Sequence, residues 1–257
     1  HTAIINGVDV VLSFPVATDM GAFLAAAPDL SKTVEPLLFP WRADDGKIKT
    51  IVIDPGHGGK DPGNRVGSHS EKTYTLLLAN ELSRQLKAAG FRVILTRTKD
   101  IYMDLENRPA VANRHDADLF VSLHFNATSG GKNSVAGAET YCITPVGASS
   151  SNAQGRGASY GRTTANASET ESLLLAYEVQ KALTKNLGAE DRGVRRARFA
   201  VLRDAKMPAI LVESGYMTHP TEGKKIFTAE YRKQIAAAIT KGILDFQRLT
   251  KPAAAKK

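Results

Sequence analysis

The chain has 257 residues, of which 42% are hydrophobic and 23% charged, the balance of an ordinary globular protein. No apolar run reaches the roughly 18 residues that a spanning helix needs, so no membrane span is expected. The net charge of +8 favours anionic partners. The most basic cluster, residues 192–198, has only Phe199 beside it as a stacking platform, so nucleic acid is not expected as a partner. The one cysteine, Cys142, excludes an intrachain disulfide and fits a buried, inert thiol.

Residues 1–46 differ in pattern from the rest of the chain. The pair Asn6-Gly7 stands between two apolar runs, which predicts a hairpin. Prolines farther along argue against a regular element before residue 46. We interpret this region as an N-terminal arm, or the remnant of a preceding module, that carries no site and packs on the catalytic domain through four apolar side chains, Leu37, Leu38, Phe39 and Trp41.

From Lys49 onward, strand and helix patterns alternate. The pattern predicts strands at 50–53, 91–96, 119–123, 138–143 and 209–212, and helices at 71–89, 105–115, 173–187 and 229–249. Such alternation indicates an α/β fold, a mainly parallel twisted sheet with helices on both faces. We expect one catalytic domain over 47–249, followed by a flexible Ala/Lys-rich tail over 250–257.

The interval 143–172 interrupts this alternation. It is rich in Ser, Gly, Ala, Asn and Thr, and long segments of this kind often serve as loops or lids over a site. Its glycines and its few apolar residues favour a cleft loop over an ordered plug. The interval is therefore predicted to leave the site open.

Four residues that could bind a metal or take part in catalysis lie at the ends of predicted strands or at the start of a helix. These are His57, Glu71, His124 and Glu213. Each has a plain structural alternative, such as a loop histidine or a first-turn carboxylate. Together, two imidazoles and one carboxylate make a three-ligand zinc set with a fourth position for water, and a second carboxylate can move protons. The set points to a zinc hydrolase.

At these residues the chain resembles the zinc-dependent N-acetylmuramoyl-L-alanine amidases of bacterial cell walls, the amidase type 3 family. The shared motifs run in the family's order from about Lys49 to Phe246: Asp54-Pro55-Gly56-His57-Gly58-Gly59, Glu71-Lys72, Thr96-Arg97, Arg108, Ser122-Leu123-His124-Phe125-Asn126-Ala127, Gly137-Ala138-Glu139-Thr140 and Val212-Glu213. The resemblance implies one zinc ion on His57, Glu71 and His124, with Glu213 as the general acid and base. It further implies peptidoglycan as the substrate and a periplasmic or extracellular location, although no export signal is visible in this chain.

In some members of the resembled family, a helix inserted at the position of 143–172 covers the zinc until a partner removes it. If that held here, Glu169 or Glu171 would reach the metal and an activator protein would be required. The open loop is the preferred interpretation for the reason given above.

Other polar residues near these motifs have less definite roles. Asp54 is a candidate for orienting an imidazole, or a plain turn residue, and Asn126 for binding substrate or shaping the end of its strand. Arg97 and Arg108 are interpreted as structural ion-pair partners. Three further histidines are expected outside the ligand set: His69 in a loop, His115 at an exposed helix end, and His219 beside the cleft. Two rival functions stay open, another metal hydrolase such as a peptidase, and a non-catalytic wall-binding module.

Overall fold

A sheet of eight strands organises residues 1–40, 48–129, 134–153 and 155–250, the part of the chain that the computed structural model describes. In sheet order, the strands are β1 (Thr2–Ile5), β2 (Val8–Val11), β11 (Asp191–Ala197), β10 (Ala138–Ile143), β12 (Ala209–Tyr216), β9 (Leu119–Asn126), β5 (Thr50–Pro55) and β8 (Arg92–Leu95). All five strands predicted from residue 49 onward are present in this sheet.

Strand direction changes once in the middle of the sheet. Strands β8, β5, β9 and β12 run parallel to one another, whereas β10 pairs antiparallel with β12. On the far side, β11 and β2 run parallel to β10, and β1 closes the edge as an antiparallel hairpin with β2. The prediction of a mainly parallel sheet is confirmed, with a reversal at β10 that the sequence pattern did not reveal.

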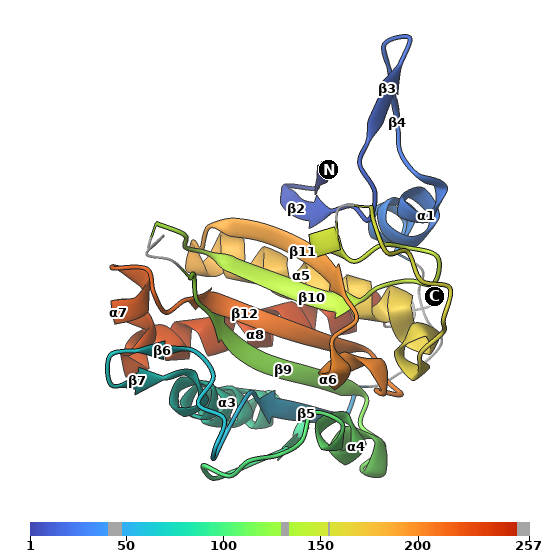
Figure 1. The fold of residues 1–257 in the computed structure, drawn as a ribbon. Helices are drawn as coiled ribbons and strands as arrows, with labels where there is room; N and C mark the ends of the chain where they lie inside the picture. The colour runs from blue at the N-terminus through green and yellow to red at the C-terminus, as the bar shows by residue number, and fades with distance from the viewer. Residues whose placement is uncertain (41–47, 130–133, 154, 251–257) are drawn as a thin grey trace, which may run out of the picture.

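Helices cover both faces of the sheet (Figure 1). The long helices α3 (Glu71–Ala88), α5 (Glu169–Leu187) and α8 (Ala229–Thr250) lie on one face, and the short helices α4 (Asn107–Arg114) and α6 (Ala200–Arg203) on the other. The four predicted helices are confirmed, with α5 beginning at Glu169 rather than at Leu173. The part of the chain that the structure describes holds no helix that is long and apolar enough to cross a membrane.

Alternation along β9 shows how the sheet separates its two faces. Leu119, Val121, Leu123 and Phe125 are buried in the main core with α3, α5 and α8. Phe120 points the other way, into a second core with α4 and α6. Because successive side chains of a strand alternate, His124 shares the face of Phe120. This face, hereafter the front face, carries the site.

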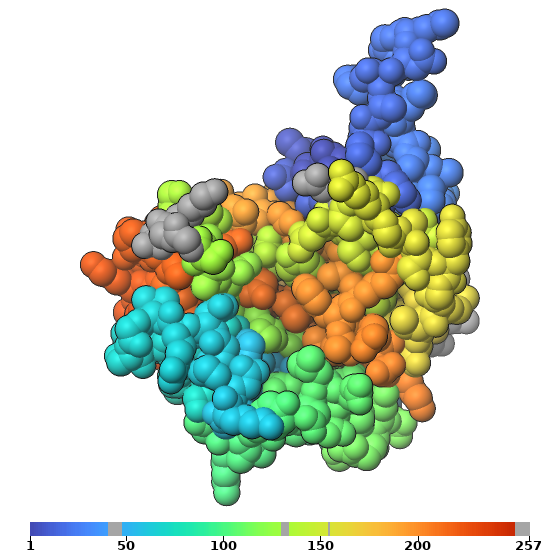
Figure 2. Space-filling view, viewed as in Figure 1, coloured from blue at the N-terminus to red at the C-terminus, as the bar shows by residue number. Residues whose placement is uncertain are grey.

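The first hairpin of the chain is part of the main sheet. Its turn at Asn6-Gly7 is confirmed, and Val10 pairs with Val194 of β11. A second hairpin, β3 (Ala17–Asp19) and β4 (Ala22–Leu24), projects from the body as an arm (Figures 1 and 2).

The segment after this arm departs from the prediction. Instead of irregular chain, it forms three short helical elements, α1 (Ala27–Asp29), the π-helix η1 (Leu30–Val34) and α2 (Glu35–Leu38). Pro28 and Pro36 fall in first turns, where a missing N–H costs nothing. Leu37 is buried as predicted, but Leu38 and Phe39 are exposed and do not anchor the segment. Trp41 lies outside the described residues, as does most of the tail, 251–257.

The segment 143–172 begins at the end of β10 and continues through η2 (Ser151–Ala153) and η3 (Thr164–Ser168) into α5. Since β10 runs against β12 and β9, this segment leaves the sheet at the amino ends of those two strands. Cys142 pairs with Ile210, near the start of β12, whereas Glu139 pairs with Glu213 at the other end. The segment is therefore directed away from the carboxyl ends of β9 and β12.

Candidate metal and catalytic site

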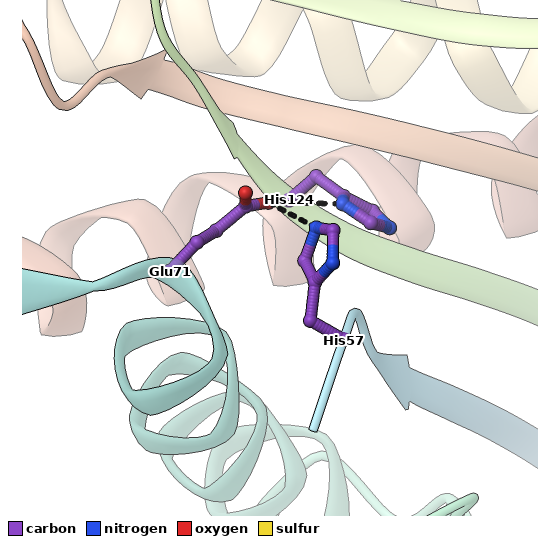
Figure 3. A group of neighbouring side chains, drawn as sticks. All are labelled: His57, Glu71 and His124. Atoms are coloured by element: carbon purple, nitrogen blue, oxygen red, sulfur yellow. Dashed lines mark hydrogen bonds and ion pairs between the residues drawn. The ribbon is translucent and has the colours of Figure 1, made fainter. Parts of the chain in front are cut away.

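Three side chains from different elements converge on the front face (Figure 3). His57 follows β5, Glu71 is the first residue of α3, and His124 belongs to β9. Glu71 Oε1 lies 3.1 Å from His57 Nε2 and 3.0 Å from His124 Nδ1. The three atoms lie within 4.8 Å of one another, so these residues form one cluster.

The loop after β5 brings His57 into this cluster because two of its glycines leave room. A Cβ at Gly56 would lie 2.3 Å from Cε1 of His124, and a Cβ at Gly63 would lie 2.6 Å from Glu71 Oε2. His57 itself has φ +61°, an uncommon value for a residue with a side chain. The close approach of the two histidines and Glu71 therefore depends on glycine at these positions.

Two buried arginines hold the backbone of this loop. Arg97 donates hydrogen bonds to the carbonyls of Pro55 and Gly56, at 2.9 and 2.8 Å. Arg108 donates to Pro55 O at 3.0 Å and to His57 O at 2.9 Å. Arg108 also forms the predicted ion pair, with Asp54 at 3.0 Å. Among the described contacts, Arg97 binds carbonyls and a hydroxyl rather than a carboxylate, so its interpretation as an ion-pair partner is wrong.

The carboxylate that orients an imidazole is Asp61, not Asp54. Asp61 Oδ2 lies 2.8 Å from His57 Nδ1, which therefore donates its hydrogen and leaves Nε2 free as a ligand atom. Asp54 is fully buried and accepts hydrogen bonds from Thr96, Ser122 and Arg108. It is neither an imidazole partner nor a plain turn residue. Asp61 lies in the turn of residues 58–63, four residues after His57. Sequence reasoning did not consider it as a partner of that imidazole.

Glu71 is fixed by the backbone and by the histidines. Phe125 N donates to Oε1 at 3.1 Å, and Asn64 N donates to Oε2 at 2.9 Å. Burial would raise the pKa of Glu71, but hydrogen bonds and charge from His124 and His57 lower it well below the ordinary value. Burial would lower the pKa of His57, yet Glu71 and Asp61 raise it overall. Negative charge is thus held in place beside both imidazoles.

Glu213 lies beside the cluster on β12. It stands directly opposite His124 in the parallel register, on the front face. Its Oε2 atom is buried and has no hydrogen-bond partner among the described residues. Removal from water, with the nearby charges of Glu71 and Glu139, raises the pKa of Glu213 well above the ordinary value. An unpaired carboxylate in such a place is suited to proton transfer.

Asn126 stabilises the end of strand β9 through hydrogen bonds within the protein. Its amide nitrogen donates to Glu139 Oε1 at 2.8 Å, and its oxygen accepts from Ala127 N at 3.0 Å. Both polar atoms are thus used within the protein, which supports the strand-shaping interpretation over substrate binding. Glu139 is also a hydrogen-bond acceptor for Tyr141 OH, at 3.0 Å.

A hollow of about 370 Å³ lies next to the cluster, and the space-filling view shows this face hollowed (Figure 2). The three clustered residues and Glu213 line this hollow. Its apolar lining comes from Leu105, Phe199, Ala200, Val201 and Leu211. No described residue from 143–172 lines it.

The remaining histidines lie outside the cluster. His69, in the short strand β7 (His69–Ser70), hydrogen-bonds Tyr74 and stacks on Phe227 with ring centroids 3.9 Å apart. His115 is exposed at the end of α4, as predicted. His219 accepts a hydrogen bond from Glu222 N at 3.0 Å and does not line the hollow. Cys142 is buried, and its burial raises the pKa of the thiol, as expected for an inert residue.

The donor set fits a zinc ion. With ligand bonds of about 2.0–2.1 Å, tetrahedral geometry places neighbouring ligand atoms about 3.3 Å apart. The separations of 3.1 and 3.0 Å between Glu71 Oε1 and the two imidazole nitrogens are close to that value. Two neutral imidazoles and one carboxylate, one of the imidazoles oriented by Asp61, make a typical catalytic zinc set.

Comparisons with known proteins identify the family of this chain. A family model described as N-acetylmuramoyl-L-alanine amidase (Amidase_3) matches residues 51–245. The chain belongs to this amidase family. It is 34% identical over 200 residues to N-acetylmuramoyl-L-alanine amidase LytC of Bacillus subtilis (strain 168), a match that covers 78% of this chain. It is 33% identical over 237 residues to N-acetylmuramoyl-L-alanine amidase AmiC of Neisseria meningitidis serogroup B, covering 84% of this chain.

A solved amidase structure has the same fold. N-acetylmuramoyl-L-alanine amidase AmiC2 of Nostoc punctiforme superposes with a TM-score of 0.66 and 33% identity, covering 79% of this chain and 99% of that one. The matches span only 36% of LytC and 56% of the Neisseria AmiC. The similarity thus covers only part of each relative, and both have further sequence outside it.

Proposed function

We propose that this amidase uses one zinc ion to hydrolyse the amide bond between N-acetylmuramic acid and L-alanine in peptidoglycan. The observation that carries the proposal is the cluster of His57, Glu71 and His124 with Glu213 opposite His124 on the next strand. Family membership supports peptidoglycan as the substrate. The basic net charge of +8 suits the anionic polymers of a cell wall.

The protein's own residues divide the chemistry between them. His57, Glu71 and His124 would hold the metal, which when bound polarises the amide carbonyl and lowers the pKa of a bound water. Glu213 takes a proton from the attacking water through its unpaired oxygen and delivers it to the leaving nitrogen of L-alanine.

We also propose that the site is open in the isolated chain, without an activator. Glu169 pairs with Lys32 at 2.9 Å and accepts a hydrogen bond from Asn166 at 2.9 Å. Glu171 lines two other surface hollows, away from the cluster. Glu169 is thus bound to other residues of the protein, and Glu171 lies away from the cluster. A peptidoglycan substrate implies action in the periplasm or outside the cell.

Product analysis tests the proposal against its rivals. Purified peptidoglycan is incubated with the zinc-loaded chain, and the soluble products are analysed by mass spectrometry. The amidase should release intact stem peptides with a new amino-terminal L-alanine. Cuts within the peptides would identify a peptidase instead, and binding without any release would identify a wall-binding module.

A further inference from the structure

Two arginines gather around a buried carboxylate on the strands next to Glu213. Glu139 is 4% exposed and stands directly opposite Glu213 in the antiparallel pair β10–β12. Arg195 Nε lies 2.8 Å from Glu139 Oε2, and Arg192 Nε lies 3.9 Å from the same atom. Two positive charges thus surround one buried negative charge. None of these three side chains takes part in the proposed hydrolysis.

The two arginines differ in how completely they are bound. Arg195 is held by Glu139, by the carbonyl of Arg192 at 3.1 Å and by Asn152 Oδ1 at 3.3 Å. Arg192 Nε is buried and has no hydrogen-bond partner among the described residues. Leaving a buried N–H donor without an acceptor costs free energy, so Arg192 Nε is expected to donate a hydrogen bond to a ligand or a water.

Arg192 is nevertheless held in position. Its guanidinium lies over the ring of Tyr216, with 5.2 Å between its Cζ and the ring centroid. Glu190 approaches Arg192 Nη1 to 3.7 Å, beyond hydrogen-bond distance, and is exposed. Glu139 is already neutralised by Arg195, so Arg192 has a positive charge to offer to a ligand.

The location of Arg192 relates it to the reaction centre. His124, Glu213 and Glu139 occupy one row across β9, β12 and β10, and β11 with Arg192 is the next strand. Neighbouring strands are about 4.8 Å apart, which places the backbone of β11 about 10 Å from Glu213. An arginine side chain extends over much of that distance. Leu211, which lines the hollow, lies two residues before Glu213 on the same strand.

We propose that Arg192 binds a carboxylate on the peptide part of the substrate, namely on the residue that follows the L-alanine. This inference rests on the proposed function, because it assumes an amide positioned over the cluster. In peptidoglycan that residue is D-glutamate linked through its side chain, so its α-carboxylate is free. Two extended residues span about 7 Å, so this carboxylate can extend from an amide over the cluster toward the strands next to Glu213. The peptide then runs over β10 and β11, and the sugar occupies the apolar hollow.

A binding experiment with product peptides tests this subsite independently of turnover. The probes are L-alanyl-γ-D-glutamyl-L-lysine and the same tripeptide with the α-carboxylate of glutamate converted to the amide. Calorimetry with the zinc-loaded chain should show the acid binding about tenfold to a hundredfold more tightly than the amide, the range of one charge-assisted pair. Equal affinity of the two probes, or no binding of either, would overturn the inference.

Variants identify the residue responsible. Arg192→Gln should abolish the difference between the probes by weakening only the acid. Glu190→Gln removes the competing exposed carboxylate and should tighten the acid alone, a gain that a folding defect cannot mimic. Arg84→Gln, at an exposed arginine that pairs with Glu81 on α3, should leave both affinities unchanged. Discrimination that survives in Arg192→Gln would assign the carboxylate to another group.

The outcome is separable from that of the proposed function. If the chain releases stem peptides but does not distinguish the probes, only the subsite is wrong. If it distinguishes the probes without cleaving peptidoglycan, the subsite stands and the hydrolytic role fails.

Discussion

Two carboxylates outside the ligand cluster have different tasks, and their environments show the difference. Asp61 is bound to His57 Nδ1 and to Gly63 N, so it is a fixed acceptor that holds an imidazole. Glu213 has a buried oxygen without a partner and a raised pKa, so it is free to exchange a proton. Substitutions at the two positions should therefore change different measurements.

Glu213→Gln should separate catalysis from metal binding. The amide keeps the shape of the side chain but cannot accept a proton, so turnover on peptidoglycan should fall at least about a hundredfold. Zinc content after dialysis, measured by atomic emission, should stay at the wild-type level. Glu178→Gln, at a buried carboxylate on α5 behind the sheet, is the matched control and should keep both properties. A near-normal rate in Glu213→Gln would assign the proton transfer to another residue.

Asp61→Asn should weaken zinc binding without removing a ligand. Loss of the carboxylate that orients His57 is expected to reduce zinc affinity about tenfold to a hundredfold, as measured by competition with a chelator. Asp100→Asn changes the same chemical group beside the same loop, where Asp100 accepts from Gly59 N and Lys72. That control touches no imidazole and should bind zinc normally. Equal affinities in both variants would contradict the orienting role of Asp61.

At the scale of residues, sequence reasoning brought together His57, Glu71, His124 and Glu213, because each falls where the pattern predicts the end of a strand or the start of a helix. It named Asp54, and not Asp61, as a candidate for orienting an imidazole, since a contact inside an irregular loop has no periodicity to predict it. The packing around Glu139 was missed because it depends on which strands are neighbours and in what register.

Among the elements, the direction of β10 has the largest consequence. The sequence pattern predicted β10 and α5, but side chains alternate between the two faces with the same period in parallel and antiparallel strands. Because β10 is antiparallel to β12, the segment 143–172 starts at the amino ends of β12 and β9. The polar composition of the segment pointed to an open site, and the reversal gives a physical reason for one.

The open site has a direct test in Glu169→Ala and Glu171→Ala. Neither variant should raise the rate on peptidoglycan, because neither carboxylate is placed to cover the cluster. Lys32→Ala is the control for Glu169, since it breaks the same ion pair from the other side. An intact chain that is inactive, and becomes active in either glutamate variant, would show that the segment is a plug.

For the whole molecule, the fold class and the order of elements after residue 49 were predictable from alternating strand and helix patterns. The pairing of the first hairpin with the main sheet was not predictable from the sequence. It depends on a single register pair, Val10 with Val194, between strands that are far apart in the chain. Tyr177 OH also donates to Ile5 O at 2.9 Å, which ties this hairpin to α5. The first eleven residues therefore extend the same sheet that carries the catalytic cluster.

The central claim, that one metal ion held by three residues makes this chain an amidase, is tested most directly by titrating zinc into the metal-free protein. Release of amino-terminal L-alanine from peptidoglycan is measured after each addition. We predict no release without metal, a linear rise with added zinc, and a break at one zinc ion per chain. Release by the metal-free protein, or a rise that continues to two ions per chain, would contradict the account.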